Sequence, residues 1–439
     1  MNNKSKTVAL INLGCTKNLV DAEEMLGRIA AGGSTICQRP EDAEVLVVNT
    51  CGFIDDSKKE SIDMIFKMAK LKENARCKKL IVTGCLAQRY SAELKNDIPE
   101  IDDVVGLKNF EKITHLTGKL KKKKNDNNNF YHNNDDWRNR IRLTPKHYSY
   151  LRISDGCDNR CTYCAIPGIR GTFMSRTVEN IMEEARQMAF EGVKEINIIS
   201  QDTTSYGVDI YGKQMLHVLL ENIAEIEGIQ WIRLLYTHPR HFYPELIKTM
   251  SVQDKICKYV DLPIQHINDT ILEKMGRKIT RKSIVTLINN LRESMHSIVL
   301  RTSVIVGFPG ETDEQFQELL EFVKKIKFER LGAFVYSKEE NTPAANFSKQ
   351  VSKKVKQRRV EEIMLAQRDI VLENNKNLIG KKVSVIVDEK DTVTGGLIGR
   401  TYGDAPEVDG KVFMNDHQIN AGEIREVVIA NVNGYDLVA

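Results

Sequence analysis

Short apolar runs alternate with amphipathic segments between residue 7 and about residue 118. The runs TVALINL, VLVVN and KLIVTG are continuous and rich in β-branched residues, as expected for strands buried on both faces of a parallel sheet, and DDVVG is a weaker fourth run. Helix-like stretches separate them, such as residues 57–70, whose apolar stripe includes Ile65 and Phe66. This βαβ series predicts a doubly wound domain over residues 1–118.

A second and longer α/β series begins near Tyr148. Its six candidate strands are YLRIS, KEINIIS, IQWIRLLY, KYVDLPI, VLRTSVIV and RLGAFVY, and segments of helical period separate them. Six strand-helix units with right-handed crossovers predict three-quarters of a (βα)8 barrel, a partial (βα)6 TIM-like barrel, over residues 145–378. A long amphipathic helix at about 355–378 completes this domain and stops before Gly380, a C-cap residue.

The remaining pattern belongs to a small C-terminal domain and a linker. Over residues 379–439 the runs KVSVIVDE, LIGRTY, KVFMN and EIREVVIANVN follow at close spacing, punctuated by Gly and Asp, which predicts a small antiparallel β-barrel. Residues 119–144 are expected to link the first two domains, because residues 119–136 are rich in Asn and Lys and have no apolar period. The whole chain is thus predicted to be an α/β multidomain protein.

The composition is that of an ordinary soluble globular protein, with 41% hydrophobic and 28% charged residues. No apolar run approaches the roughly 18 residues of a membrane span. The apolar core near the N-terminus, Val8 to Ile11, is too short for a secretory signal. We therefore expect a cytoplasmic protein with no membrane partner.

The net charge of +4 hides an asymmetry. Residues 380–439 hold six Lys and Arg against ten Asp and Glu, so the positive excess lies elsewhere in the chain. Part of it is the basic run of Lys119 and residues 121–124, which we interpret as a solvated part of the linker.

Six of the nine cysteines fall into two groups of three, and an odd total in a large cytosolic chain argues against a disulfide framework. The first group follows three different predicted strands, at Cys15, Cys51 and Cys85, and the second is a compact C-x3-C-x2-C run at Cys157, Cys161 and Cys164. Ligands of open α/β sheets bind beyond the carboxyl ends of the strands, so residues far apart in sequence can converge there. The alternative for the first group is three buried structural cysteines.

Both groups are candidate metal sites. Iron-sulfur clusters are held by cysteine thiolates, four in a full set, so three leave one position for another ligand. Gly156 lets the backbone approach a cluster closely at the second group, and Tyr163 precedes its last cysteine. Structural zinc is the alternative, although the usual second pair of Cys or His does not follow at the usual spacing. Cys37, Cys77 and Cys257 lie outside both patterns.

The compact cysteine run, with an aromatic residue before its last cysteine on the first loop of a partial barrel, resembles the radical S-adenosylmethionine superfamily. Together with the N-terminal triplet and the small C-terminal barrel, it resembles the methylthiotransferases of that superfamily, whose C-terminal barrel is an OB-like TRAM domain. The resemblance implies two 4Fe-4S clusters, one at each triplet. It also implies S-adenosylmethionine as methyl donor and radical source, and an electron donor such as flavodoxin or ferredoxin.

Two motifs resemble the branch of this family that modifies the β-carbon of an aspartate in ribosomal protein S-twelve, free or in the small subunit. They are ISQDTTSYG at residues 199–207 and RTYGDAPEVDG at residues 400–410. The acidic C-terminal domain also suits a basic protein better than a nucleic acid, which makes nucleic acid an unlikely substrate. A tRNA adenosine methylthiotransferase is the closest alternative, and a non-catalytic zinc- and RNA-binding factor is a more distant one.

Five further residues are candidates for the site. Cofactor binding is predicted for Glu195, at the start of the second barrel strand, for Gln265 and His266, which end the fourth, and for Arg301. Arg301 needs a carboxylate partner, which could come from the cofactor, from the substrate or from an internal acid. Asp202 is predicted to orient the substrate, and its alternative is a turn cap.

Overall fold

The computed structural model describes residues 5–118, 136–392, 395–415 and 420–439. The chain divides into two compact units: residues up to 143 together with 165–172, and residues 144–164 together with 173–439. Most of the expected linker, residues 119–135, lies outside the described residues. The end of that segment is described and belongs to the first unit, where Arg140 Nε donates to Glu23 Oε2 at 2.7 Å.

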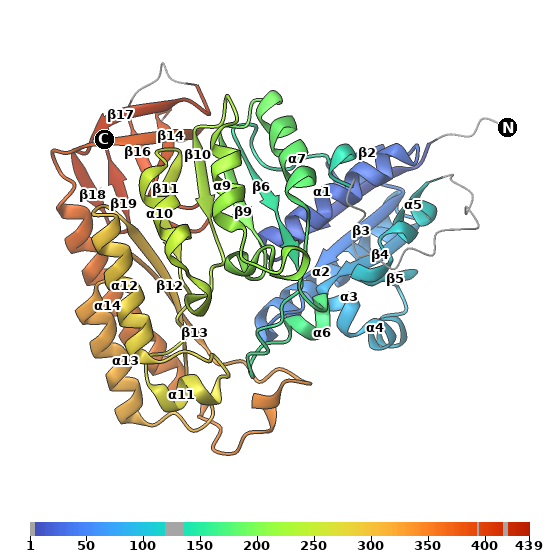
Figure 1. Ribbon diagram of the computed structural model, residues 1–439. Helices are drawn as coiled ribbons and strands as arrows, with labels where there is room; N and C mark the ends of the chain where they lie inside the picture. Colours follow the sequence, from blue (N-terminus) through green and yellow to red (C-terminus); the bar gives the residue numbers. More distant parts are fainter. Residues whose placement is uncertain (1–4, 119–135, 393–394, 416–419) are drawn as a thin grey trace. The chain divides into compact units, whose positions relative to one another are not determined.

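The first unit holds a five-stranded parallel sheet in the order β2-β1-β3-β4-β5 (Figure 1). The strands are β1 (Thr7–Asn12), β2 (Thr35–Ile36), β3 (Val45–Thr50), β4 (Lys79–Gly84) and β5 (Asp103–Val105). The helices are α1 (Thr16–Ala31), α2 (Asp55–Asn74), α3 (Cys85–Arg89), α4 (Ser91–Asp97), α5 (Glu111–Thr117) and α6 (Ile166–Arg170). The four predicted strands are confirmed. The edge strand β2 was not predicted, because two residues are too few to show a strand pattern.

Helices cover both faces of this sheet, as a doubly wound domain requires. One apolar cluster joins the sheet to α1 and α5, through residues such as Met25 and Ile113, and another joins it to α2 and α4, through Ile65 and Leu94. Phe66, which the periodicity placed on the buried stripe of α2, is 44% exposed. The stripe is therefore narrower than predicted, and it is centred on Ile65.

The second unit is built on six parallel strands in the order β6-β9-β10-β11-β12-β13, the order of a partial (βα)6 barrel. They are β6 (Tyr148–Arg152), β9 (Glu195–Ile199), β10 (Trp231–Leu234), β11 (Ile256–Asp261), β12 (Val299–Val306) and β13 (Arg330–Val335). The main helices between and after them are α7 (Val178–Phe190), α9 (Leu216–Ala224), α10 (Pro244–Val252), α11 (Asp269–Lys274), α12 (Arg281–Ser294), α13 (Asp313–Ile326) and α14 (Lys353–Lys376). All six predicted barrel strands are confirmed.

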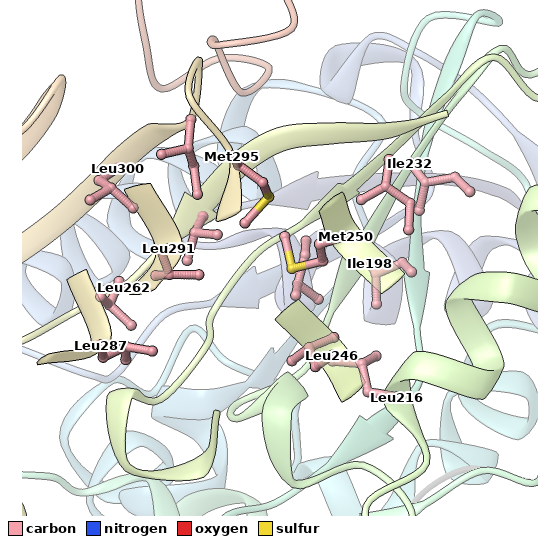
Figure 2. Close-up of a cluster of buried hydrophobic side chains, with 14 of the residues drawn as sticks. Ile198, Leu216, Ile232, Leu246, Met250, Leu262, Leu287, Leu291, Met295 and Leu300 are labelled. Atoms are coloured by element: carbon pink, nitrogen blue, oxygen red, sulfur yellow. The ribbon is translucent and has the colours of Figure 1, made fainter. Parts of the chain in front are cut away.

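Alternate residues of the barrel strands have opposite character. The helix-facing residues are apolar, and Figure 2 shows Ile198, Ile232 and Leu262 packed with side chains from the surrounding helices. The other set pairs Tyr150 with Asn197 and Asn197 with Arg233 across neighbouring strands. A barrel with buried polar groups on its inner face needs hydrogen-bonding partners inside.

The C-terminal domain is a curled six-stranded sheet in the order β17-β14-β15-β16-β19-β18. Its strands are β14 (Lys382–Lys390), β15 (Leu397–Thr401), β16 (Val412–Met414), β17 (Ile424–Val428), β18 (Asn431–Asn433) and β19 (Asp436–Val438). The neighbours are antiparallel as predicted, except that β16 and β19 are parallel. A tight turn at Gly434, whose φ is +62°, joins β18 to β19 as an antiparallel hairpin.

Candidate functional site

Cys15, Cys51 and Cys85 stand directly beyond the carboxyl ends of three neighbouring strands, β1, β3 and β4. The pairing of Asn49 with Thr83 brings these ends level. Cys51 and Cys85 are buried, and Cys15 is exposed. The three thiols therefore share one edge of the sheet, as predicted, with one side open to solvent.

Glycines allow the three cysteine loops to come together. A side chain at Gly14, whose φ is +93°, would place its Cβ 2.8 Å from the Cβ of Cys51. One at Gly84, whose φ is +95°, would lie 2.4 Å from the carbonyl oxygen of Thr50. Only glycine accepts both this backbone conformation and this contact. Steric crowding thus explains why glycine precedes Cys15 and Cys85.

A buried arginine lies beside this triplet. Arg170 Nη2 donates to Asp21 Oδ2 at 2.6 Å and to Asn18 Oδ1 at 3.0 Å, and it lies 3.8 Å from Cys85 Sγ. Burial raises the pKa of Cys85 to about 12, and the charge of Arg170 acts in the opposite direction. Sequence reasoning missed Arg170, Asn18 and Asp21, since nothing in the cysteine spacing points to residues on α1 and α6.

Cys157, Cys161 and Cys164 occupy the loop that follows β6 in the second unit. Gly156, which was expected to let the backbone approach a cluster closely, has a φ of +74°, a conformation that favours glycine. Burial raises the pKa of Cys157 to about 11, while Asn159 Nδ2 donates to its sulfur at 3.5 Å. Arg277 Nη1 donates to Cys161 Sγ at 3.6 Å. Asn159 and Arg277 were also missed from the sequence.

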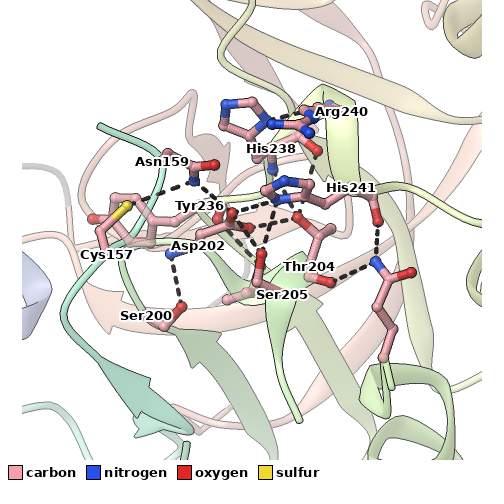
Figure 3. A network of polar contacts seen from close by, with 12 residues as sticks. Cys157, Asn159, Ser200, Asp202, Thr204, Ser205, Tyr236, His238, Arg240 and His241 are labelled. Carbon is pink, nitrogen blue, oxygen red and sulfur yellow. Dashed lines mark hydrogen bonds and ion pairs between the residues drawn. The ribbon is translucent and has the colours of Figure 1, made fainter. Parts of the chain in front are cut away.

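Asp202 is the centre of a hydrogen-bond network next to this loop (Figure 3). Its Oδ2 accepts from Asn159 Nδ2 at 2.7 Å, from Ser205 Oγ at 2.9 Å and from His241 Nδ1 at 2.7 Å. Burial by itself would raise the pKa of Asp202, but the hydrogen bond and charge of His241 hold it well below its usual range. Asp202 therefore stays ionised and fixes Asn159 against Cys157.

A cavity of about 780 Å³ opens beside this network. Its lining is mixed in charge and includes Asp158, Asn159, Asp202, Asp209, Lys213, Arg240, His241 and Lys278. Residues 158 and 159 lie between Cys157 and Cys161, so the cavity borders the cysteine loop itself. Asp202, which was predicted to orient the substrate, thus lines a cavity, and its role there stays a prediction.

Gln265 and His266 follow β11 at the carboxyl end of the barrel, as expected. Gln265 has a φ of +69° and is held by hydrogen bonds from its N–H to Ser303 O and from the Ile305 N–H to its own carbonyl. His266 is fully buried, and burial together with Arg359 lowers its pKa to about 3. Its Nδ1 accepts from the backbone N–H of Asn268, whereas its Nε2 has no partner among the described residues.

Glu195 and Arg301, both predicted to bind the cofactor, form ion pairs within the protein. Glu195 is the first residue of β9, at the opposite end from the cysteine loop, and its two oxygens accept from Arg233 Nε and Arg400 Nη2, each at 2.8 Å. Arg301 pairs with Asp261 at 2.9 Å and with Asp409 at 3.4 Å, so its carboxylates are internal acids. Each charge thus has partners within the protein, which favours the internal acid as the partner of Arg301, and cofactor binding by either residue stays a prediction.

Both triplets have the donor chemistry of an iron-sulfur site: three thiols, glycine in the adjoining backbone, and N–H groups directed at sulfur. Within the described ranges, no three Cys, His, Asp or Glu side chains are gathered around one metal-ion position. Each thiolate of a 4Fe-4S cluster binds a different iron, so the fit rests on the donor set of each triplet and, for the first, on the exposed position of Cys15. In the same ranges, no helix is long and apolar enough to cross a membrane.

Comparison with known proteins finds three family models along the chain: the Radical SAM superfamily over residues 151–323, Uncharacterized protein family UPF0004 over 7–106, and the TRAM domain over 379–439. A relative from Clostridium perfringens, named ribosomal protein uS12 methylthiotransferase RimO, is 47% identical over 436 residues, 98% of this chain and 97% of its own. A relative of the same name from Clostridium botulinum is 47% identical over 434 residues, with the same coverage.

Solved structures resemble the fold at low sequence identity. The radical S-adenosylmethionine methyltransferase TsrM from Kitasatospora setae matches with a TM-score of 0.53 and 13% identity, covering 78% of this chain and 74% of its own. The cobalamin-dependent S-adenosylmethionine radical enzyme OxsB, with aqua-cobalamin and S-adenosylmethionine bound, matches with a TM-score of 0.50 and 12% identity, covering 82% and 56%. Both likenesses concern the fold alone.

Proposed function

Since the chain belongs to the family of radical S-adenosylmethionine enzymes named ribosomal protein uS12 methylthiotransferases, we propose that it transfers a methylthio group to the β-carbon of an aspartate in ribosomal protein S12. The observation that carries this proposal is the pair of cysteine triplets, each on loops at the carboxyl ends of parallel strands. Full-length similarity to the named relatives, from the N-terminal triplet to the TRAM domain, supports it.

The family carries a 4Fe-4S cluster with S-adenosylmethionine, and we propose that Cys157, Cys161 and Cys164 hold it. When bound, the two together supply the radical that removes a hydrogen atom from the acceptor carbon. Asn159 and Arg277 donate hydrogen bonds to the sulfurs of this loop, which stabilises their thiolate form.

His266 and Gln265 are proposed to bind S-adenosylmethionine. The Nδ1 of His266 accepts a backbone N–H and its lowered pKa keeps the ring neutral, so the ring proton sits on the buried Nε2. This N–H is a donor with no partner among the described residues, which suits a polar group of the cofactor.

A second 4Fe-4S cluster is proposed at Cys15, Cys51 and Cys85, where it would carry the sulfur to be inserted. The thiol edge is open on the side of the exposed Cys15, as a site that releases a group to another molecule requires. We propose flavodoxin or ferredoxin as the electron donor, and the cytoplasm, where ribosomal proteins are made, as the place of reaction.

The acceptor is proposed to enter the cavity beside Asp202. Lys213, Arg240 and Lys278 in its lining can pair with the carboxylate of the acceptor aspartate, and Asp158 and Asp209 can pair with basic neighbours in the substrate loop. Asp202 would hold the cavity wall and the cysteine loop in fixed positions relative to each other, because it accepts hydrogen bonds from both His241 and Asn159.

Mass spectrometry of ribosomal protein S12 and of tRNA nucleosides, from cells with and without the gene, tests the function. We expect S12 to lose the mass of a methylthio group, with tRNA unchanged. Loss from tRNA with S12 unchanged would instead identify an adenosine-modifying enzyme. Metal analysis after anaerobic purification should give about eight irons per chain, and zinc in place of iron would leave only a binding function.

A further inference from the structure

Arg170 is a buried charge whose position the proposed chemistry does not yet explain. It ends α6, which belongs to the first unit although it follows the cysteine run of the second. Ile169 anchors this helix in the apolar core next to α1, and Arg170 is only 2% exposed. A charged guanidinium is kept in such a place only where it has specific partners.

Its partners link the guanidinium to all three cysteine loops. The same Oδ1 of Asn18 accepts from Arg170 Nη2 at 3.0 Å and from the Cys85 thiol at 3.3 Å. The Nδ2 of Asn18 donates to Leu13 O and Thr50 O, each at 3.0 Å, just before Cys15 and Cys51. A displacement of Arg170 would therefore move Asn18 and, through it, the backbone or thiol of each cysteine loop.

We propose that Arg170 is a positioning residue that sets the reduction potential of the N-terminal cluster through its contact with Cys85. This inference rests on the second cluster of the proposed function. Nη2 of Arg170 lies 3.8 Å from Cys85 Sγ and 2.6 Å from Asp21 Oδ2, so a cation and an anion stand together at one corner of the site. Both side chains are buried, where charges act more strongly than in water.

The sign of the effect follows from the charge that a cluster gains on reduction. A nearby cation, and an N–H directed at sulfur, stabilise the reduced form and raise the potential, whereas an anion lowers it. Arg170→Met should therefore make the N-terminal cluster harder to reduce, and Asp21→Asn should make it easier to reduce. Opposite shifts from two neighbouring residues are not expected from loosened packing.

The experiment is a potentiometric titration followed by electron paramagnetic resonance, with the full-length chain reconstituted anaerobically. A background in which Cys157, Cys161 and Cys164 are replaced by Ala leaves only the N-terminal cluster, with about four irons. In this background we expect Arg170→Met to lower the reduced-to-oxidised ratio at a fixed potential roughly tenfold, a shift of about 59 mV for a one-electron couple. Asp21→Asn should raise the ratio, and Arg170→Lys should restore part of the loss.

Arg140 supplies a matched control. Its side chain is as buried as that of Arg170, and it pairs with Glu23 on the same helix α1 at 2.5 Å. Arg140→Met should leave the titration unchanged while weakening the fold to a similar degree. In the reverse background, without the N-terminal cysteines, Arg277→Met should shift the remaining cluster and Arg170→Met should not.

The outcomes separate this proposal from the function itself. If Arg170→Met binds the normal amount of iron and titrates like its parent, the proposal is wrong although the second cluster stands. If Arg170→Met takes up no iron, Asp21→Asn decides, and an unchanged or lowered potential there overturns the proposal. If the parent background binds no iron, the second cluster itself is refuted, and this inference with it.

Discussion

Replacing Glu195 with Gln tests whether this residue is structural, as its contacts indicate, or binds the cofactor. The carboxylate is fully buried between Arg233 and Arg400, and although burial raises its pKa, the two arginines together hold it below the ordinary value. Arg400 keeps its ion pair with Asp388 at 2.7 Å in the variant, whereas Arg233 loses its anionic partner and keeps neutral ones, the carbonyl of Tyr402 at 2.6 Å and the ring of Tyr259. Removing one partner of such a buried pair costs about 3–5 kcal/mol of unfolding free energy.

Denaturant unfolding of the apoprotein, monitored by tryptophan fluorescence and circular dichroism, measures this cost. Glu373→Gln is the control, since its pair with Lys327 is about half exposed on each side and contributes at most about 1 kcal/mol. The affinity of the reconstituted Glu195→Gln enzyme for S-adenosylmethionine, measured below its unfolding range, should equal that of the parent. A loss of affinity with less than about 1 kcal/mol of destabilisation would refute the structural assignment and restore cofactor binding.

Three further variants address the two cysteine sites and their surroundings. Asp202→Asn should keep the iron content but lower the rate of S12 modification at least about tenfold, because the charge that pairs with His241 and fixes Asn159 is lost; a normal rate would contradict this. Replacing the N-terminal cysteine triplet with Ala should leave about four irons and cleavage of S-adenosylmethionine without methylthio transfer, measured by iron assay and chromatography. The pKa of His266 is about 3 in the folded protein, so as pH falls the imidazole of the unfolded chain takes up a proton first. This residue should therefore lower the free energy of unfolding by about 1.4 kcal/mol per pH unit below about pH 6.5. His266→Gln should flatten that slope in unfolding curves taken between about pH 7 and about pH 5.

The sheets were predictable because strands buried on both faces leave continuous apolar runs, and these runs correspond to β1, β3, β4 and the barrel strands. The cysteines were predictable for a related reason, since each follows such a run and parallel strands end at one edge. The short strands β2 and β19 were missed because two or three residues carry no detectable period.

Contacts between distant residues were not predictable from one sequence. Arg170 and Asp21 are 149 residues apart, and Arg277 and Cys161 are 116 apart, so no local spacing records either pair. Glu195 shows the same limit in another form. A glutamate at the start of a strand can be solvated, bind a ligand or form an ion pair, and its actual partner Arg400 comes from the C-terminal domain.

The motif at residues 400–410, which favours one branch of the family, makes side-chain contacts with residues of the barrel. Asp404 pairs with Arg330, Asp409 accepts from Tyr259, and Glu407 accepts from Tyr148, while Arg400 reaches Glu195. Tyr148, Glu195 and Arg330 are each the first residue of a barrel strand, so the motif covers the amino ends of the strands.

This placement changes the argument from charge. The acidic balance of residues 380–439 suits a basic ribosomal protein, but three of these acids, Asp388, Asp404 and Asp409, are already paired with Arg400 or with arginines of the barrel. The motif can therefore mark a branch of the family without touching its substrate, because its acids and the barrel residues that bind them must match each other. We expect the residues that select the acceptor to lie at the carboxyl end of the barrel, where Asp202 and the cavity are.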